Sequence, residues 1–442
     1  MATRAMRFIE AARKPVPEGT YAIGAGLLVA GLSAYGFQIL SFRQLDEAQY
    51  NALNGLWVMV FVVAPGVFQP IEQEVARAVS HRRAQGIGAA PLVKRAAVLG
   101  GGLALFVTLA SLIGAGPLVS NLFHGNWMLL VGLLIAIAAY YCAHLTRGTL
   151  AGNGRFGPYG LMHGTEGIVR VVACGALVAL GVSSPGPFGL ALALPPFVAV
   201  AVSLRGQKRL LVPGPSAPYS ELSTALGWLL LGSVLAQALS YAGFLGATLL
   251  ATPAQKPLVG KFIAGLFIAR IPILLFQAVQ AALLPKLAEH AGAGRHADFR
   301  AGLRTLMLIV TAVGAIGILG GFTVAPWAGK VLFGQKFILG HRDLGLLAVG
   351  SAAFILALTV AQGLIALRGY QAAAFAWVAG IVGFVGVTAV GKDLFLRVEL
   401  GFAAGSLCAA AVMAIAITAK LRGGLGDVAD LVAVIEHETL EV

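Results

Sequence analysis

Charged side chains are scarce in this 442-residue chain: Asp, Glu, Lys and Arg make up 11% of it, whereas hydrophobic residues make up 58%. A typical soluble domain is about one-quarter charged and about one-half apolar, so the composition excludes a large soluble catalytic domain. A membrane-spanning helix needs about 20 mostly apolar residues, and the chain has room for about a dozen. The sequence therefore predicts an all-α membrane protein.

Cysteine and enzymatic motifs are also scarce. The three cysteines, Cys142, Cys174 and Cys408, lie in apolar runs, and no Cys-x-x-Cys or Cys/His grouping occurs. This pattern favours neither a disulfide framework nor a metal site. No nucleotide-phosphate loop is recognisable, so we expect no cofactor and no enzymatic activity. The eight histidines are scattered, and we expect most of them at solvated positions near span ends.

Long apolar runs, in contrast, are abundant. The first follows a polar N-terminal segment and has full spanning length, which predicts a retained helix instead of a cleaved signal peptide. The seventh is long and Gly-rich, so we expect it to tilt or bend. The twelve expected spans are 20–41, 53–76, 96–119, 126–146, 160–182, 188–204, 222–250, 259–284, 303–325, 344–367, 371–390 and 395–419.

Lysine and arginine are distributed unevenly between the loops. With the N-terminus inside, 21 of the 31 Lys and Arg residues fall in inside segments and 8 in outside segments, while Arg170 and Arg270 lie within spans. This asymmetry obeys the positive-inside rule. We therefore expect a multi-pass protein of the cytoplasmic membrane with both termini in the cytoplasm. The net charge of +13 then requires no nucleic-acid partner.

The spans fall into two halves of six. Phe68-Gln69 recurs as Phe276-Gln277, and the Gly/Ala pattern of 147–154 recurs in 362–369, which predicts an internal duplication. Parallel six-span repeats are a transporter arrangement. The proline-containing loop between the halves is expected to be an extended, mobile linker. The expected units are a cytoplasmic segment 1–19, an N-lobe 20–204, a linker 205–221, a C-lobe 222–419 and an acidic cytoplasmic tail 420–442.

Span eight carries the most informative polar residues. Arg270 lies near its middle, and Gln277 and Gln280 share one helical stripe with it. Because charges in the bilayer are costly, this stripe predicts a cavity that holds water or a polar ligand. The alternative is that Arg270 only pairs with a neighbouring helix. Pro272 should bend the span next to Arg270.

Other spans carry polar residues that could complete the same cavity or form an ion pair. Glu166 and Arg170 in span five have the i, i+4 spacing of an intrahelical ion pair, for which we favour a structural role over gating. The cavity candidates lie in the first two spans of the two halves, and for each of them hydrogen bonding between helices is an equally good explanation. These candidates are Tyr35, Gln38, Gln69, Glu72, Gln237 and Tyr241.

Several segments resemble the multidrug/oligosaccharidyl-lipid/polysaccharide (MOP) exporter superfamily. They are 69–77 at the end of span two, 147–156 after span four, 270–287 in span eight and 331–334 before span ten. Within the superfamily the chain resembles the polysaccharide-subunit flippases, which are similar to the lipid II flippases. The resemblance implies a V-shaped, MATE-like pair of six-helix lobes that works by alternating access, with a central cationic cavity lined by the first two helices of each lobe.

The resemblance also implies a substrate, a polyprenyl-diphosphate-linked oligosaccharide that crosses the membrane for cell-surface polysaccharide biosynthesis. Arg270 matches the family's tendency to place Arg in the cavity, where its planar fork suits phosphate oxygens. The implied partners are this lipid-linked oligosaccharide, membrane lipids, H⁺ or Na⁺ as coupling ion, and a polysaccharide polymerase or glycosyltransferases of the cell envelope.

Two alternative functions stay open. One is an ion-coupled multidrug or organic-cation antiporter, which is disfavoured because span one lacks the carboxylate that this branch typically places there. The other is a non-transporting membrane scaffold for cell-envelope enzymes. A scaffold would tolerate the loss of Arg270, whereas a flippase would not.

Overall fold

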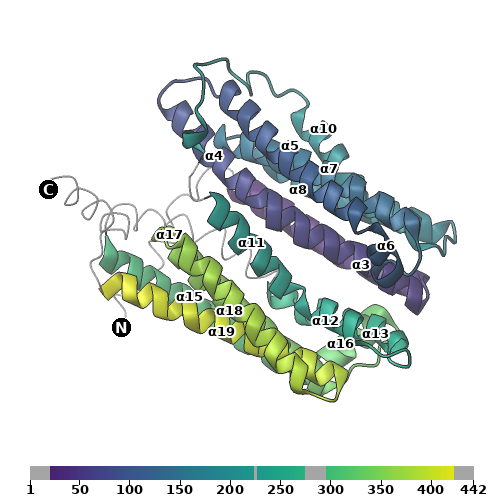
Figure 1. The fold of residues 1–442 in the computed structure, drawn as a ribbon. Coiled ribbons are helices and arrows are strands. Elements are labelled where there is room, and N and C mark those ends of the chain that lie inside the picture. The colour runs from purple at the N-terminus through teal and green to yellow at the C-terminus, as the bar shows by residue number, and fades with distance from the viewer. Residues whose placement is uncertain (1–19, 223–225, 274–294, 423–442) are drawn as a thin grey trace.

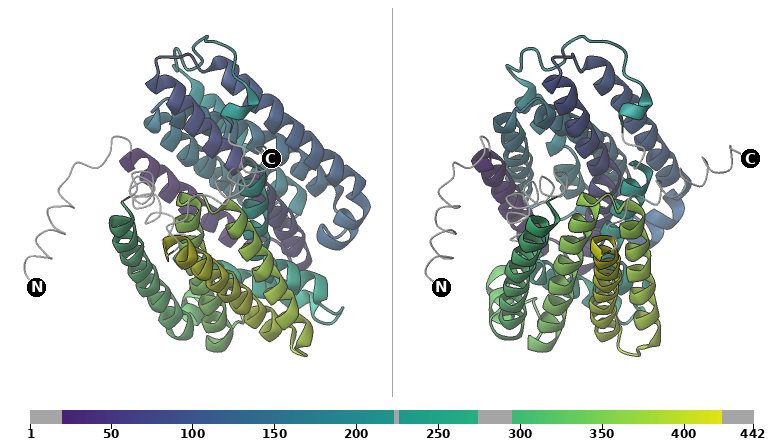
Figure 2. Two further views of the ribbon diagram at one scale, coloured as in Figure 1. Left: turned by 60° about the vertical axis from the view of Figure 1, so that its left-hand side comes forward. Right: turned by 90° about the vertical axis from the view of Figure 1, so that its left-hand side faces the viewer.

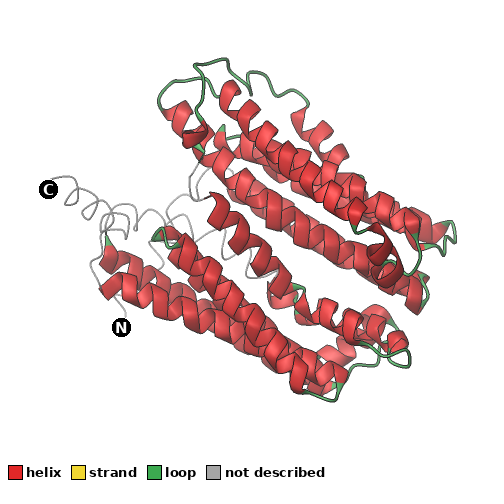
Figure 3. Cartoon of the chain, viewed as in Figure 1, coloured by secondary structure: helices red, strands yellow, loops and turns green. Residues whose placement is uncertain are grey.

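The computed structural model describes residues 20–222, 226–273 and 295–422. Throughout these ranges the regular structure is helical, without a strand (Figure 3). Ten helices are long and apolar enough to cross a membrane, and a bent pair of helices makes an eleventh span. Of the expected span 259–284, only the part up to residue 273 lies within the described residues. The expectation of an all-α membrane protein is confirmed.

The first half of the chain forms one helical bundle. In its second span, helices α3 and α4 are joined by a π-helical turn that contains Pro65, because proline cannot donate the usual helical hydrogen bond. Helix α7 packs against most of the other helices of this bundle. The helices are α2 (Thr20–Gln44), α3 (Glu47–Val63), α4 (Gln69–Ala84), α5 (Ala90–Ile113), α6 (Ala115–Pro117), α7 (Trp127–Gly152), α8 (Phe156–Ala179), α9 (Pro185–Ala193) and α10 (Pro195–Leu204), with π-helical turns at Ala64–Phe68 and Leu118–Leu122.

The second half forms another bundle after a short 3₁₀ turn, Tyr219–Glu221. Its helices are α11 (Leu226–Ser240), α12 (Ala242–Leu250), α13 (Lys256–Ala269), α15 (His296–Thr323), α16 (Ala325–Phe333), α17 (His341–Ala366), α18 (Tyr370–Val390) and α19 (Leu394–Arg422). Helices α11 and α12 meet at a bend of 56° beside Tyr241, which confirms that the seventh span is bent. Helix α17 is the most buried span and packs against α13, α15 and α19.

The two bundles lie side by side and splay apart toward one side of the molecule (Figure 1). Two further views of the ribbon show the same pair of bundles turned about the vertical axis (Figure 2). We call the side on which α2 begins and α19 ends the termini side, and the opposite side the far side. The V-shaped arrangement of two lobes agrees with the fold expected from the sequence.

Polar contacts fasten the two bundles together at the far side. Arg43, at the end of α2, donates hydrogen bonds to the backbone oxygens of Val331 (2.7 Å) and Leu332 (2.9 Å) in α16. Glu47, at the start of α3, forms an ion pair of 2.8 Å with Lys261 of α13. The far side is therefore the closed side of this conformation.

The segment between the bundles is fastened to the first bundle. Arg82, near the end of α4, has a side chain only 5% exposed and donates to both carboxylate oxygens of Glu221, at 2.7 and 2.8 Å. It also donates to the backbone oxygens of Pro215 (3.0 Å) and Ser216 (3.1 Å). The expected linker 205–221 is therefore bound to α4 in this stretch, where the buried Arg82 guanidinium contacts the irregular chain.

Candidate functional site

Two groups of polar side chains lie in the membrane-spanning part of the described residues. One, the inter-bundle cluster, contains Tyr35, Ser240, Tyr241 and Arg270, and lies where the bundles meet. The other, the charge network, lies inside the first bundle. The charge network contains Glu72, Tyr140, His144, Arg147, Tyr159, His163, Glu166 and Arg170.

The position of Arg270 follows from the local sequence. Helix α13 ends at Ala269, and Arg270 is its C-cap, whose N–H still bonds to the backbone oxygens of Leu266 and Phe267. Pro272 lacks an N–H and cannot continue the hydrogen-bond ladder of α13, so the helix is interrupted at Arg270 and helical structure resumes at residues 271–273. The irregularity expected at Pro272 therefore takes the form of a break in the helix at Arg270, the residue just after α13.

Arg270 contacts only uncharged groups within the described residues. Its Nη2 donates a hydrogen bond to the Ser240 hydroxyl, and its guanidinium lies 4.1 Å from the centre of the Tyr241 ring. Tyr35 of the first bundle donates to the backbone oxygen of Phe267 at 3.1 Å. No carboxylate in the described part of the chain pairs with Arg270. A half-buried cation thus lies at the junction of the bundles, and no carboxylate of residues 20–222, 226–273 or 295–422 neutralises it.

A small pocket adjoins Arg270 between the two bundles. Its free volume is about 10 Å³, close to the minimum that holds one water molecule. A larger ligand therefore fits only if the bundles move apart. The pocket is lined by Asn54, Trp57 and Val58 of α3 and by Tyr241, Phe244, Ile263, Leu266, Phe267 and Arg270 of the second bundle.

One end of the charge network is built around Glu72 of α4. Its carboxylate lies 2.7 Å from His144 Nδ1 and 3.3 Å from Arg147 Nε, both on α7. The Tyr159 hydroxyl of α8 donates to the other carboxylate oxygen at 2.9 Å. The side chains of Glu72, His144 and Arg147 are 12%, 8% and 5% exposed, so these contacts are largely screened from water.

The other end of the charge network is built around Glu166 of α8. Glu166 forms an ion pair with Arg170 one turn later and accepts a hydrogen bond of 2.7 Å from the Tyr140 hydroxyl. Arg147 Nη1 lies 3.9 Å from Glu166 and 3.3 Å from His163 Nδ1. Arg147 therefore lies between two carboxylates, and two glutamates balance two arginines in the interior of the bundle.

Two glycines allow the close helix packing that assembles this network. A Cβ at Gly148 would approach the Glu72 backbone oxygen to 2.6 Å, and one at Gly152 would approach Val79 Cβ to 2.6 Å. Small residues let membrane helices approach closely. The Arg147-Gly148 motif therefore brings α7 against α4, where Glu72 reaches His144 and Arg147.

The structure divides the predicted site residues between several environments. Tyr35, Tyr241 and Arg270 meet in the inter-bundle cluster, and Glu72, Glu166 and Arg170 belong to the charge network. Gln38 is 1% exposed in the core of the first bundle and accepts a 2.9 Å hydrogen bond from Tyr50. In this conformation it lines no open cavity. Gln69 is exposed and Gln237 is half-buried, while Gln277 and Gln280 lie outside the described residues.

Sequence reasoning missed several members of the charge network. The expectation of solvated histidines is wrong for His144, which is buried and bound to Glu72. Arg147, which the sequence placed in a loop after span four, lies within α7. A signal was present, since Tyr159, His163, Glu166 and Arg170 follow one stripe of α8 at helical spacing.

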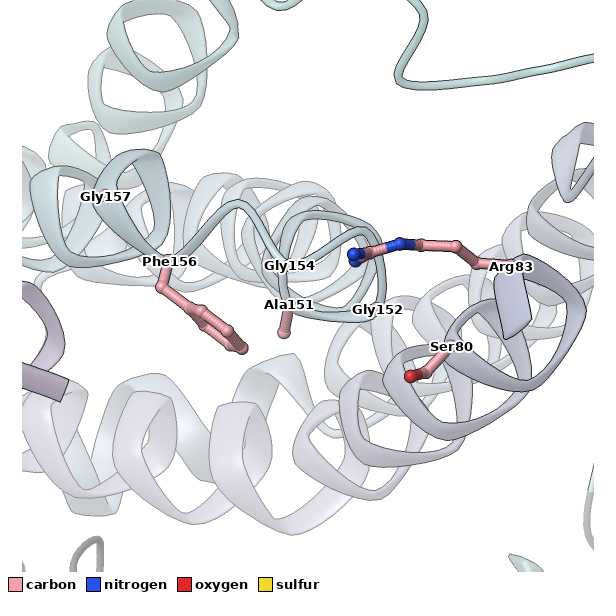
Figure 4. A pocket seen from close by; sticks show the side chains of 7 residues that line it. All are labelled: Ser80, Arg83, Ala151, Gly152, Gly154, Phe156 and Gly157. Carbon is pink, nitrogen blue, oxygen red and sulfur yellow. The ribbon is translucent and has the colours of Figure 1, made fainter. Parts of the chain in front are cut away.

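A separate hollow of about 310 Å³ lies at the termini side of the first bundle (Figure 4). Arg83 reaches across it to Gly154, which has a φ of +70° and at which a Cβ would collide with the Arg83 guanidinium. This hollow belongs to neither polar cluster, and we assign it no role. Its lining residues are Ser80, Arg83, Ala151, Gly152, Gly154, Phe156 and Gly157.

Comparison with known sequences finds distant relatives. No protein-family model matches the chain. The uncharacterized protein Rv1510 of Mycobacterium tuberculosis (strain H37Rv) is 27% identical over 383 residues, which cover 83% of this chain and 84% of the relative. The uncharacterized protein Rv3630 of the same strain is 26% identical over 376 residues, covering 82% and 83%.

Comparison with solved structures identifies the fold. An outward-facing multidrug resistance MATE family transporter of the MOP superfamily matches with a TM-score of 0.71 and 14% identity, covering 93% of this chain and 97% of that one. The Vibrio cholerae MATE transporter VcmN matches with a TM-score of 0.69 and 16% identity, covering 92% and 97%. The chain therefore has the fold of the MATE transporters.

Proposed function

We propose that this protein is a membrane exporter that works by alternating access and binds an anionic, phosphate-containing substrate between its two bundles. The observation that carries the proposal is the position of Arg270, which lines the pocket between the bundles and pairs with no carboxylate in the described part of the chain. A half-buried cation in this position attracts an anion, and burial weakens salt screening of that attraction.

The chemistry of Arg270 suits phosphate. A guanidinium binds phosphate oxygens with two parallel N–H donors. The Tyr241 ring holds the guanidinium by a cation–π contact, which uses no N–H donor. Together with the sequence resemblance to the polysaccharide-subunit flippases, this favours a polyprenyl-diphosphate-linked oligosaccharide as the substrate. The site of action would be the cytoplasmic membrane, with the termini side facing the cytoplasm.

The closed far side supports a transport cycle in this orientation. Arg43 and the Glu47–Lys261 ion pair hold the far ends of the bundles together, whereas the bundles splay apart on the termini side. In the proposed cycle a substrate enters from the termini side and leaves when these far-side contacts break. H⁺ or Na⁺ would supply the driving force.

The test of the proposal is to replace Arg270. Removing a charge-assisted hydrogen bond to the substrate should cost about 1.5–3 kcal/mol, or roughly ten- to hundredfold in affinity. Arg270→Ala should reach the membrane and fail to complement a strain that lacks its polysaccharide flippase. Arg270→Lys keeps the charge without the planar fork and should complement partly.

Protein level in the membrane is measured for each variant. Arg83→Ala is the matched control, because it removes an exposed arginine of the first bundle outside both polar clusters and should complement fully. Normal export by Arg270→Ala at normal protein level would contradict the anion site and favour a non-transporting scaffold.

The charge network favours a second candidate, an ion-coupled antiporter of organic cations. It holds two carboxylates and two histidines inside the membrane-spanning part of one bundle, and such groups can exchange protons or cations. An antiporter should confer resistance to organic cations that is lost in Glu72→Gln and kept in Arg270→Ala. A flippase, in contrast, should lose its export activity in Arg270→Ala.

A further inference from the structure

Helix α19 of the second bundle contains a fully buried carboxylate that neither polar cluster uses. Glu399 is 0% exposed, and its two carboxylate oxygens have no hydrogen-bond partner among the described residues. It lies in the second turn of a membrane-spanning helix, near the far side. By contrast, Glu166 of the first bundle is held by Arg170 and Tyr140.

The residues beside Glu399 on α19 pack tightly against other helices of the second bundle. The neighbouring residues of α19 contact three other helices: Val398 packs against α12, Gly401 against α18 and Phe402 against α17. Helices α12 and α18 bring no charged side chain. Phe395, one turn before Glu399, stacks on Phe262 of α13.

The charged groups near Glu399 do not neutralise it. Asp343 and Arg342, at the start of α17, and Asp393, just before α19, act on it electrostatically. Arg342 is committed to Asp343 at 2.9 Å and has a side chain 61% exposed. Two of these three groups, Asp343 and Asp393, are negative. They therefore disfavour a further negative charge on Glu399.

Two other cations, on α19 and on the adjoining α13, also form no ion pair with Glu399 among the described residues. Arg397, two residues before Glu399 on α19, donates to the backbone oxygen of Gly391 at 3.4 Å. Lys261 of the adjoining α13 is paired with Glu47 across the bundles. Glu399 is thus a carboxylate without a counter-ion among the described residues.

We propose that Glu399 is a proton-binding site of the second bundle, which holds a proton while buried in this conformation and releases it when the far side opens. An ionised, unpaired carboxylate is very costly in an apolar interior, and a bound proton removes that cost. A metal cation needs several oxygen ligands, and no group of three or more His, Cys, Asp or Glu side chains in the described part of the chain forms such a set.

This proposal rests on the proposed function in one respect, since alternating access supplies the conformation that would expose Glu399. The route to the inter-bundle cluster runs through α12, because α19 packs against α12 and α12 begins at the bend beside Tyr241. Protonation of Glu399 would therefore change the position of α12, and with it the position of Tyr241 over Arg270.

The first test is the infrared C=O stretching band of protonated carboxyl groups, which ionised carboxylates lack. It is recorded on the purified full-length protein at neutral pH. The wild type should show a band that disappears in Glu399→Gln. The control is Asp298→Asn, which removes an exposed carboxylate of α15 and should leave the band unchanged.

The second test is the pH dependence of the melting temperature, measured on the wild type and on Glu399→Gln. The folded state holds a proton that the unfolded state releases above the ordinary Glu range, so raising the pH from about 5 to about 8 should destabilise the protein. Glu399→Gln, neutral throughout, should lose this dependence.

Each test has an outcome that overturns the proposal, and for the second it is a wild-type melting temperature that does not fall as the pH rises, or that falls equally in Glu399→Gln. Wild type without the protonated band, or Glu399→Gln with the band intact, would show that Glu399 is ionised. If Na⁺ stabilises the wild type but not Glu399→Gln, the ion that binds at Glu399 is sodium and not a proton. Neither measurement involves transport, so failure here leaves the result for Arg270 unaffected.

Discussion

At the scale of single residues, the charge network shows how two glutamates are accommodated inside a membrane bundle. Arg147 reaches both carboxylates, and Arg170 and His144 each contact one. Removing one partner of a buried ion pair leaves an uncompensated charge, which typically costs 3–5 kcal/mol. The network is therefore sensitive to the loss of any one charge, whatever its part in transport.

This sensitivity gives a prediction for Glu166→Gln. The substitution leaves Arg170 without its ion-pair partner and Arg147 with one carboxylate instead of two, so we expect a strong loss of stability and of protein level in the membrane. The measurement is the melting temperature of the purified protein together with its amount in membranes. A variant with wild-type stability but no dependence on pH or Na⁺ would show that Glu166 couples transport instead.

The network also marks a limit of sequence reasoning at this scale. Arg147 lies one residue beyond the expected span 126–146, because a charge next to an apolar run ordinarily marks its end. Glu399 was overlooked for the same reason, since it lies near the start of the expected span 395–419. In both cases the burial of the side chain depends on neighbouring helices, and the hydropathy of one segment gives no information about them.

At the scale of elements, the expected spans that lie wholly within the described residues correspond to helices or helix pairs, because each apolar run has the length of the bilayer core. The bend of the seventh span was predicted from its glycines, and the structure places it at Tyr241. What hydropathy could not predict is pairing between helices: Glu72, His144 and Glu166 lie on three different elements and meet only through the packing of α4, α7 and α8.

The segment that joins the bundles gives a prediction at the element scale. Ala217, which follows the Arg82-bound stretch, is 1% exposed. A cysteine at Ala217, in a protein without its native cysteines, should react slowly with a thiol reagent. Adding Arg82→Gln should release the segment and speed the reaction, by roughly tenfold if the local opening costs about 1.4 kcal/mol less.

The same fastening should respond to acid. The Arg82 guanidinium holds the pKa of Glu221 below its usual range by donating hydrogen bonds to the ionised carboxylate. A lowered pKa means that the fastening is fully present above the ordinary Glu range and is lost as the pH falls through the lowered value. Labelling at position 217 should therefore accelerate on acidification. Equal rates at all pH values and in Arg82→Gln would show that other contacts hold the segment.

At the scale of the whole molecule, the resemblance to the MOP exporters predicted the V-shaped fold, while the conformation could not be predicted. Which side is closed depends on a few contacts between residues far apart in the sequence, such as Arg43 with Val331 and Glu47 with Lys261. Local patterns carry no information about such pairs. The sequence likewise predicted that Arg270, Tyr35 and Tyr241 line one cavity, but not that Ser240 would bond to Arg270.

The far-side contacts give a prediction at this scale. Glu47→Lys places two like charges together and should separate the far ends of the bundles, whereas Glu47→Lys combined with Lys261→Glu restores an ion pair and should close them. Spin labels at the exposed positions Asn121 and Ala254, one on each bundle, report the separation as a distance distribution. An unchanged distribution in Glu47→Lys would show that Arg43 and apolar packing suffice to hold the far side closed.

The attachment of the joining segment to α4 also decides where foreign sequence can be inserted. Lys208 and Arg209 are exposed and lie before the stretch that Arg82 and Gly88 contact, so a rigid marker domain for electron microscopy could be inserted between them. The marker would then follow the first bundle, because the chain beyond it is anchored there by Arg82. In electron microscopy images, the marker would serve as a fixed reference, and the rotation of the second bundle would be measured relative to it.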